Sequence, residues 1–357
     1  MIRAAVILGN LGHIILIIGL AELSSLAWSL AYHENATTGI AVAAILTIAC
    51  GAVLRLIFRS KQEGGMSFKE SIALVTLGWI VASAFGCLPY IFSGYLPSFT
   101  DAWFETVSGF TTTGASVVTD IESWPKGLLF WRSLTQWLGG MGIIALFVAV
   151  ISGMGVRANQ MFRAEVPGPI ADKISPRIRE TARKLWLTYV VISLACALTL
   201  VVFGMNIFDA LCHTFATLAT GGFSTKNSSI AFYQSPAIQW TLIFFMFVAG
   251  ASFTLHYQAF KNRKPRIYLR NPEFKLYAGI VLTATFIAAL GLKMAAPISG
   301  WEETLRSACF QIVSMLTTTG FVSADYDKWP AMAAGMVFLV MFVGGCAGST
   351  GGNIKPG

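Results

Sequence analysis

Residues 105–114 read Glu-Thr-Val-Ser-Gly-Phe-Thr-Thr-Thr-Gly, and two further stretches of the chain align with them without gaps. They are residues 213–222, His-Thr-Phe-Ala-Thr-Leu-Ala-Thr-Gly-Gly, and residues 311–320, Gln-Ile-Val-Ser-Met-Leu-Thr-Thr-Thr-Gly. Each stretch begins with a polar residue and ends nine residues later with a glycine. Self-similarity at a spacing of about 100 residues indicates a repeat architecture, and it sets the frame for the rest of the sequence.

Each copy stands between two long apolar segments. The parts that precede the glycines, about residues 101–111, 209–219 and 302–317, are too short or too polar to cross a bilayer. We therefore expect re-entrant half-helices there. Asp101 and Asp209 stand four residues before Glu105 and His213, at the position where an N-cap side chain is expected. Ser307 occupies the same position in the third copy, four residues before Gln311.

The composition places the chain in a membrane. Of its 357 residues, 55% are hydrophobic and 12% are charged, whereas soluble domains have roughly 25% charged residues. Apolar stretches long enough to form or begin a membrane span are residues 2–30, 39–58, 71–96, 128–152, 185–204, 237–257, 274–293 and 331–343. The predicted fold class is an all-α polytopic membrane protein made of helix, re-entrant pore loop, helix units.

The distribution of charge sets the orientation. With the N-terminus in the cytoplasm, 19 of the 25 Lys and Arg residues fall on the cytoplasmic side, as the positive-inside rule requires. Acidic residues such as Glu105 and Asp209 gather on the outer side, where they raise the local cation concentration. The basic residues form no groove-like patch interleaved with exposed aromatic residues, so nucleic acid is not expected as a partner.

The Thr and Gly residues that end each copy suit one kind of chemistry. Carbonyl groups freed from helical bonding can lie at membrane depth only where protein or water surrounds them. Glycine permits the dihedrals that keep successive carbonyls on one side, and rings of carbonyls can replace the hydration shell of a monovalent cation. A single Thr-Thr-Thr-Gly string usually just ends a helix, but three copies in register favour an ion filter.

Small residues interrupt the second long helix of each unit, at residues 139–142, 249–252 and 344–348. Such residues permit close helix approach or a break that lines a cavity. The third interruption runs on to Gly352 and contains five glycines in nine residues, so we expect no straight helix there.

The chain resembles the TrkH/KtrB family of bacterial potassium uptake proteins in several strings that recur in the same order. They are residues 104–115, Gln136-Trp-Leu-Gly-Gly-Met-Gly-Ile-Ile144, Arg163-Ala-Glu-Val-Pro-Gly-Pro169, Ala219-Thr-Gly-Gly-Phe-Ser-Thr225 and Gly344-Gly-Cys-Ala-Gly-Ser-Thr-Gly-Gly352. The opening helix pair is closer to the TrkH branch.

The resemblance implies potassium uptake across the bacterial inner membrane through a pseudo-fourfold pore, with K⁺ as the transported ion and no covalently bound cofactor. Carried over residue by residue, the potassium-binding filter positions are Thr112, Thr113, Gly114, Thr220, Gly221, Gly222, Thr318, Thr319 and Gly320. The implied intramembrane gate comprises Gly344, Gly345, Gly348, Ser349, Thr350, Gly351 and Gly352. The implied partners are a second copy of the chain, membrane lipid, and a cytosolic nucleotide-binding regulatory subunit of the TrkA or KtrA type.

We divide the chain into a helix pair, three pore repeats and two cytoplasmic loops. The pair covers residues 1–60, the repeats cover 68–156, 185–260 and 274–357, and the loops cover 157–184 and 261–273. Because relatives continue through a fourth unit, we expect the third repeat to be incomplete and the freed backbone of residues 344–352 to lack hydrogen-bond partners.

The sequence supports other function classes less well. No Walker-type loop, catalytic carboxylate pair or Ser/His/Asp arrangement is visible, so an enzyme is not expected. Two alternatives stay open: a secondary transporter of another monovalent cation, with broken helices around a midplane site, and a truncated, non-conducting membrane partner. The sequence also leaves open whether transport is channel-like or a symport. Glu105, His213 and Gln311 fit equally well as supports of the filter and as polar residues at a wet helix end.

The predicted orientation can be tested with single cysteines in a cysteine-free background. Thr112→Cys, Thr220→Cys and Thr318→Cys should react with an impermeant thiol reagent added to intact cells. Arg177→Cys and Arg263→Cys should react only after the cells are lysed, since the positive-inside rule places them in the cytoplasm. Labelling at position 177 in intact cells would show that the orientation is reversed.

Overall fold

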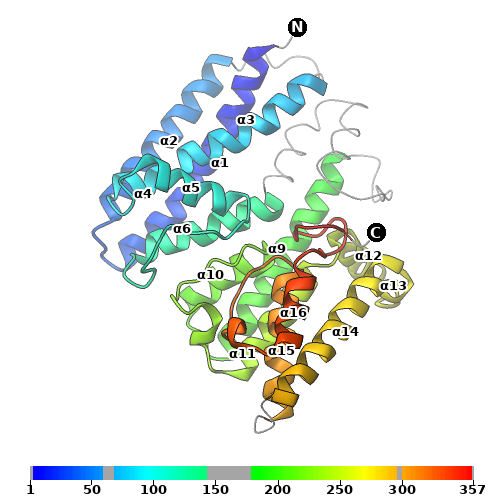
Figure 1. The fold of residues 1–357 in the computed structure, drawn as a ribbon. Coiled ribbons are helices and arrows are strands. Elements are labelled where there is room, and N and C mark those ends of the chain that lie inside the picture. The colour runs from blue at the N-terminus through cyan, green and yellow to red at the C-terminus, as the bar shows by residue number, and fades with distance from the viewer. Residues whose placement is uncertain (1–2, 59–67, 143–177, 296–299, 356–357) are drawn as a thin grey trace. The chain divides into compact units, whose positions relative to one another are not determined.

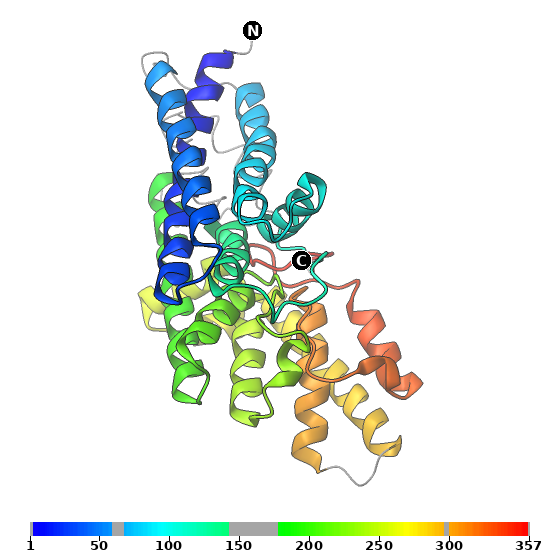
Figure 2. The same ribbon diagram turned by 90° about the vertical axis from the view of Figure 1, so that its left-hand side faces the viewer.

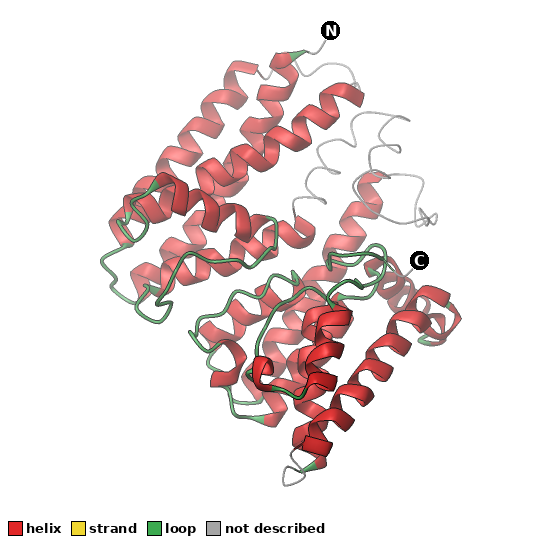
Figure 3. Ribbon diagram, in the orientation of Figure 1, coloured by secondary structure: helices red, strands yellow, loops and turns green. Residues whose placement is uncertain are grey.

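The computed structural model describes residues 3–58, 68–142, 178–295 and 300–355 (Figure 1). The chain divides into two compact units. The first holds the described residues up to 142 together with residues 178–183, and the second holds those from Lys184 onward. In the described part, regular structure is helical apart from an isolated parallel bridge between Val343 and Ile354 (Figure 3).

The first unit begins with a pair of long helices, and α1 packs along α2 and against α3 and α6. Figure 2 shows the two blue helices side by side. The helices of this unit are α1 (Ala4–Ala31), α2 (Thr37–Phe58), α3 (Phe68–Gly86), α4 (Leu88–Phe92), α5 (Phe99–Phe110) and α6 (Lys126–Trp137). A π-helical turn, Leu138–Gly142, follows α6 at the first of the predicted small-residue interruptions.

Glycines let α1 and α2 approach closely. A Cβ atom on Gly51 would lie 2.7 Å from the backbone nitrogen of Leu16 and 3.0 Å from the carbonyl oxygen of Gly12. Because these neighbours are backbone atoms of α1, neither can turn away as a side chain could. The crossing of the two helices therefore depends on the absence of a side chain at position 51.

The second unit contains the remaining helices, and in it α11 packs on α10 and α15, while α14 packs on α15 and α16. They are α9 (Ile178–Val202, which begins in the first unit), α10 (Ile207–Leu218), α11 (Pro236–Ala249), α12 (Phe253–Asn262), α13 (Arg266–Arg270), α14 (Pro272–Ala295), α15 (Trp301–Leu316) and α16 (Ala331–Val340). Two short 3₁₀ turns, Ser229–Phe232 and Tyr326–Lys328, lie in the connections.

Several helices have the length and composition of membrane spans. The described residues contain five such helices, or six if α11 and α12 form one span bent by 97°. That bend falls at the predicted interruption 249–252. The predicted span 71–96 is divided into α3 and α4, α16 ends at Val340, and the later part of the predicted span 128–152 lies outside the described residues.

The three predicted half-helices are confirmed as α5, α10 and α15. The predicted N-caps are wrong for Asp101, Asp209 and Ser307. Ser98 and Asn206 are the caps of α5 and α10, and their side-chain oxygens accept from the amides of Asp101 at 3.4 Å and Asp209 at 2.9 Å. The two aspartates instead stand in the first helical turn, where their negative charge complements the helix dipole. The third half-helix begins after Gly300, so Ser307 lies in its interior.

Gly51→Ala should destabilise the first unit, because a methyl group at this position meets backbone of α1 at less than van der Waals distance. Overpacking of this kind costs about 1–3 kcal/mol. The measurement is the temperature at which the detergent-solubilised protein loses its monodisperse elution peak. Gly279→Ala in α14 is the matched control, since nothing lies within 4 Å of a Cβ atom there. An equal or higher unfolding temperature for Gly51→Ala than for the control would contradict the close crossing.

Candidate functional site: the threonine and glycine loops

The three half-helices end in the same backbone motif. In α5, the amide of Thr112 donates to the carbonyl of Gly109 at 3.0 Å, and the amide of Thr113 donates to that of Ser108 at 2.9 Å. This pair of bonds is the Schellman arrangement that closes a helix C-terminus. The corresponding bonds at the other two ends are Thr220 to Thr217 (3.1 Å), Gly221 to Ala216 (2.9 Å), Thr318 to Met315 (3.0 Å) and Thr319 to Ser314 (2.8 Å).

A threonine occupies the left-handed position of each motif, where glycine is usual. The φ angles are +55° at Thr112, +52° at Thr220 and +60° at Thr318. A left-handed conformation in a residue other than glycine costs of order 1–3 kcal/mol, and it persists only where the surrounding structure enforces it. Three repeats that retain the same strained residue therefore point to a constraint on this backbone.

The last residue of each loop is a glycine that is also left-handed. The φ angles are +76° at Gly114, +77° at Gly222 and +76° at Gly320. The residue between threonine and glycine lies outside the positive-φ region in all three loops. Backbone that leaves the helix in this way frees carbonyl oxygens, and rings of such oxygens can replace the hydration shell of a monovalent cation. This geometry suits coordination by carbonyl oxygens, and the described residues contain no group of three or more His, Cys, Asp or Glu placed to hold a metal ion.

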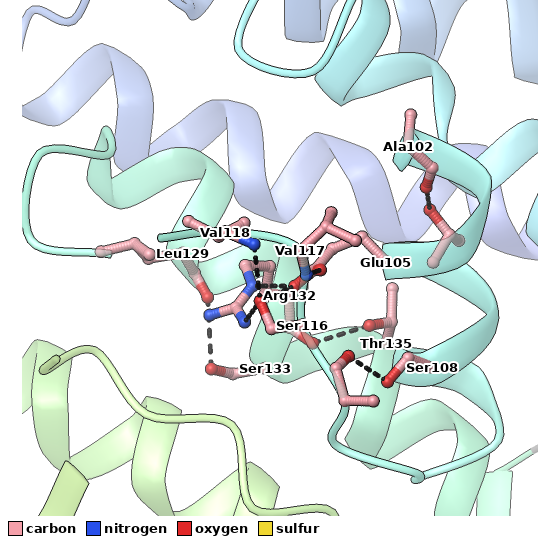
Figure 4. Close-up of polar contacts among 12 residues, drawn as sticks. Ala102, Glu105, Ser108, Ser116, Val117, Val118, Leu129, Arg132, Ser133 and Thr135 are labelled. Atoms are coloured by element: carbon pink, nitrogen blue, oxygen red, sulfur yellow. Dashed lines mark hydrogen bonds and ion pairs between the residues drawn. The ribbon is translucent and has the colours of Figure 1, made fainter. Parts of the chain in front are cut away.

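A buried ion pair supports the first loop (Figure 4). Arg132 of α6 donates from Nε to Glu105 Oε1 at 2.7 Å, and the two side chains are 1% and 0% exposed. The other oxygen, Glu105 Oε2, accepts from the amide of Val117 at 3.0 Å. Ser116 donates to Glu105 Oε1 at 3.0 Å. The carboxylate thus ties the segment that follows Gly114 to the half-helix α5.

The corresponding residues of the other two repeats, His213 and Gln311, also bond to the segment that follows their loop, but they form no ion pair within the described part of the chain. Buried His213 lies 2.9 Å from Ser224 Oγ through Nε2 and 2.7 Å from the carbonyl of Asp209 through Nδ1. Gln311, also buried, donates from Nε2 to the carbonyl of Ala324 at 2.9 Å. Of the two interpretations that the sequence left open, support of the loops is the one that these contacts favour.

Loops two and three approach each other inside the second unit. A Cβ atom on Gly222 would lie 2.0 Å from the carbonyl oxygen of Thr319. No side chain can enter this space without moving backbone. A glycine is thus required at position 222 for two reasons: its φ angle is positive, and the neighbouring loop leaves no room for a side chain.

The glycine-rich segment that follows α16 packs on the break between α11 and α12. The amide of Cys346 donates to the carbonyl of Gly250 at 2.8 Å, and the amide of Phe253 donates to the carbonyl of Gly348 at 3.0 Å. Thr350 donates from Oγ1 to the carbonyl of Leu218, the last residue of α10, at 2.9 Å. The interruptions of the second and third repeats therefore exchange hydrogen bonds.

The same segment contacts the third loop directly. The amide of Gly352 donates to Thr318 Oγ1 at 2.8 Å. Ala347 donates its amide to the carboxylate of Glu273 in α14, and Lys355 donates to the carbonyl of Gly351. The expectation that the freed backbone of residues 344–352 lacks partners is wrong for the amides of Gly344, Cys346, Ala347, Ser349, Thr350 and Gly352.

Sequence reasoning missed three charged residues that hold these loops: Arg132, Glu273 and Lys355. A signal was present for Arg132, because a charged residue inside a predicted span is a functional candidate by default. Glu273 and Lys355 lie at the ends of apolar segments, where charged residues are common, and nothing in their sequence context distinguishes them from other charged residues.

Comparisons with known proteins agree on one family. Residues 36–356 match the TrkH family, described as cation transport proteins. The chain is 41% identical to the Trk system potassium uptake protein TrkH of Escherichia coli over 329 residues, which is 92% of this chain and 68% of that protein. It is 38% identical to the TrkH protein of Halomonas elongata over 353 residues, 98% of this chain and 72% of the relative. The crystal structure of the potassium transporter TrkH from Vibrio parahaemolyticus superposes with a TM-score of 0.85 at 32% identity, covering 99% of this chain and 72% of that one.

Glu105→Gln should destabilise the protein strongly, because it leaves the guanidinium of Arg132 buried beside a neutral amide. Breaking one side of a buried ion pair costs about 3–5 kcal/mol. The measurement is again the apparent unfolding temperature in detergent. Glu303→Gln in the first turn of α15 is the control, since that side chain is exposed. If both variants unfold at the temperature of the parent, the ion pair does not support the first loop.

Proposed function

The chain belongs to the TrkH family of cation transport proteins, and on that premise we propose that it is the ion-conducting subunit of a Trk-type potassium uptake system. The relatives are potassium uptake proteins by name, and the structural neighbour is a potassium transporter. The family is one of membrane transporters, and potassium is the ion that it carries.

The repeated loop geometry is the observation that carries this proposal. Three loops share a left-handed threonine and a left-handed glycine, with a residue outside the positive-φ region between them. Loops of this kind offer several carbonyl oxygens to one dehydrated monovalent cation. Because these oxygens are uncharged, no ionised side chain has to be buried at the site. The filter residues are Thr112, Thr113, Gly114, Thr220, Gly221, Gly222, Thr318, Thr319 and Gly320. The C-terminal ends of α5, α10 and α15 add a negative potential at the loops.

The glycine-rich segment acts as the gate. Its residues are Gly344, Gly345, Gly348, Ser349, Thr350, Gly351 and Gly352. Support comes from the bond between the amide of Gly352 and Thr318 Oγ1, which joins this segment to a filter residue. To clear the ion path, the segment must give up that bond and those to the α11–α12 break. Backbone bonds of this kind can form and break without a change in covalent structure or charge.

The proposal extends to the remaining features of such a system. The chain lies in the bacterial inner membrane with its N-terminus in the cytoplasm, works as a homodimer, and is controlled by a nucleotide-binding subunit of the TrkA or KtrA type. It needs no bound cofactor and carries out no catalytic step. The division into a helix pair and three pore repeats belongs to the same proposal.

Potassium uptake in a bacterium without its own uptake systems tests the function. The protein is expressed both as the 357-residue chain and as that chain joined to the fourth unit of a relative. Growth at low potassium and rubidium influx in at least one of the two forms are the expected results. Failure of both forms, with each present in the membrane, would reject the proposal.

Gly222→Ser should raise the permeability of sodium relative to potassium. A side chain at position 222 would displace the carbonyl of Thr319 and strain the loop's own backbone, so the oxygens would lose their spacing. The measurement is the ratio of sodium to potassium flux in a form that takes up potassium. Gly279→Ser, at an open position in α14, is the matched control. An unchanged flux ratio in a folded Gly222→Ser protein would remove Gly222 from the filter.

A further inference from the structure

An apolar pocket of about 390 Å³ lies in the second unit among α9, α11, α12, α13 and α14. Its volume is within the range of about 300–1,000 Å³ that is usual for ligand sites. The wall is mostly aliphatic and aromatic, and includes Val191, Ile192, Phe244, Phe247, Phe260 and Phe274. The two polar side chains in the wall bond to protein groups: His256 Nδ1 lies 2.8 Å from the hydroxyl of Tyr268, and His256 Nε2 lies 2.9 Å from the carbonyl of Val248.

Part of the pocket wall is exposed at the surface of the described structure. Val191, Phe244 and Phe260 are 47%, 59% and 64% exposed. Val191 and Phe244 belong to helices with the length or apolar composition of membrane spans. Because the wall is mostly apolar, a ligand that fills this pocket must carry an apolar part.

A cluster of cations borders the same pocket. Three wall residues, Phe260, Tyr268 and Phe274, alternate along the chain with exposed basic residues, which are Lys261, Arg263, Lys264, Arg266, Arg270 and Lys275. No ion pair within the described residues neutralises any of the six. Basic groups that flank a cleft between membrane helices are suited to the headgroups of anionic lipids.

We propose that this pocket binds an anionic phospholipid of the surrounding membrane. An acyl chain fills the apolar pocket, and the headgroup phosphate lies against the basic residues of α13 and its flanking turns. Charge complementarity decides for an anionic lipid, since the net charge of a zwitterionic lipid is zero and would not balance the basic cluster. The proposal does not depend on the ion-conducting role of the chain.

The site adjoins the element that holds the glycine-rich segment. Val248 and Ala251 line the pocket, and between them Gly250 accepts a hydrogen bond from Cys346. A bound acyl chain therefore packs against the turn on which the segment rests.

Lipid binding to the full chain can be measured by native mass spectrometry in detergent. Phosphatidylglycerol is titrated into the parent and into the double variant Arg266→Gln/Arg270→Gln. Each basic residue near a lipid surface contributes about fivefold to anionic lipid affinity, so the double variant should bind phosphatidylglycerol roughly 25-fold more weakly. Arg55→Gln/Lys69→Gln is the matched control, because it removes two exposed charges from the first unit, and it should bind as the parent does. Phosphatidylcholine of the same chain length should bind the parent more weakly than phosphatidylglycerol.

Ala195→Phe provides an independent test, since Ala195 lines the pocket and a ring there occupies its volume. It should weaken phosphatidylglycerol binding while leaving the basic cluster intact. Equal binding of the two lipids by the parent, or unchanged phosphatidylglycerol binding in Arg266→Gln/Arg270→Gln, would overturn the proposal. So would a change of oligomeric state in Ala195→Phe without a change in lipid binding, because the pocket would then be an interface between copies of the chain.

Discussion

Backbone that leaves the helix inside a membrane must find its hydrogen-bond partners within the protein, because lipid supplies none. The described structure meets this constraint by pairing its irregular segments with one another. The break between α11 and α12 exposes the carbonyl of Gly250 and the amide of Phe253, and the segment after α16 supplies their partners at Cys346 and Gly348. Neither interruption would be satisfied alone. Each irregular segment therefore supplies hydrogen-bond partners that the other needs. A substitution that displaces the backbone of the segment after α16 should also destabilise the break between α11 and α12, and the reverse.

The three loops have the same backbone conformation, but different side chains support it in each repeat. Glu105 uses two carboxylate oxygens and the charge of Arg132, whereas His213 and Gln311 bond to Ser224 Oγ and the carbonyl of Ala324. A buried ion pair gains little over a neutral pair while both partners are present, but it is very costly once one partner is lost. The first loop is thus the most sensitive of the three to mutation. This asymmetry fits a pore in which the loops need the same shape and have diverged in the residues behind them.

Sequence reasoning recovered the features that are local and repeated. The half-helices were predictable because their length and their Thr and Gly endings recur in register. The caps were not, because Ser98 and Asn206 stand three residues before the aspartates that the register indicated. Arg132 lies 27 residues beyond Glu105, in a segment without an aligned counterpart. Several hydrogen bonds of the glycine-rich segment, such as that from Cys346 to Gly250, join two backbone atoms, and the sequence of side chains gives no sign of those.

The energetics of those backbone contacts bear on how a gate of this kind can work. A hydrogen bond between neutral groups contributes about 0.5–1.5 kcal/mol net, so the few bonds that join residues 344–352 to the α11–α12 break and to Thr318 together amount to several kcal/mol. Moving a two-state equilibrium from 1:99 to 99:1 requires about 5.5 kcal/mol. The bonds seen here amount to a free energy of the same order, so a change of binding energy of that size is enough to release the segment in the proposed gate. Glycine adds no side-chain contacts of its own, so the hydrogen bonds of the segment account for most of the free energy that holds it in place.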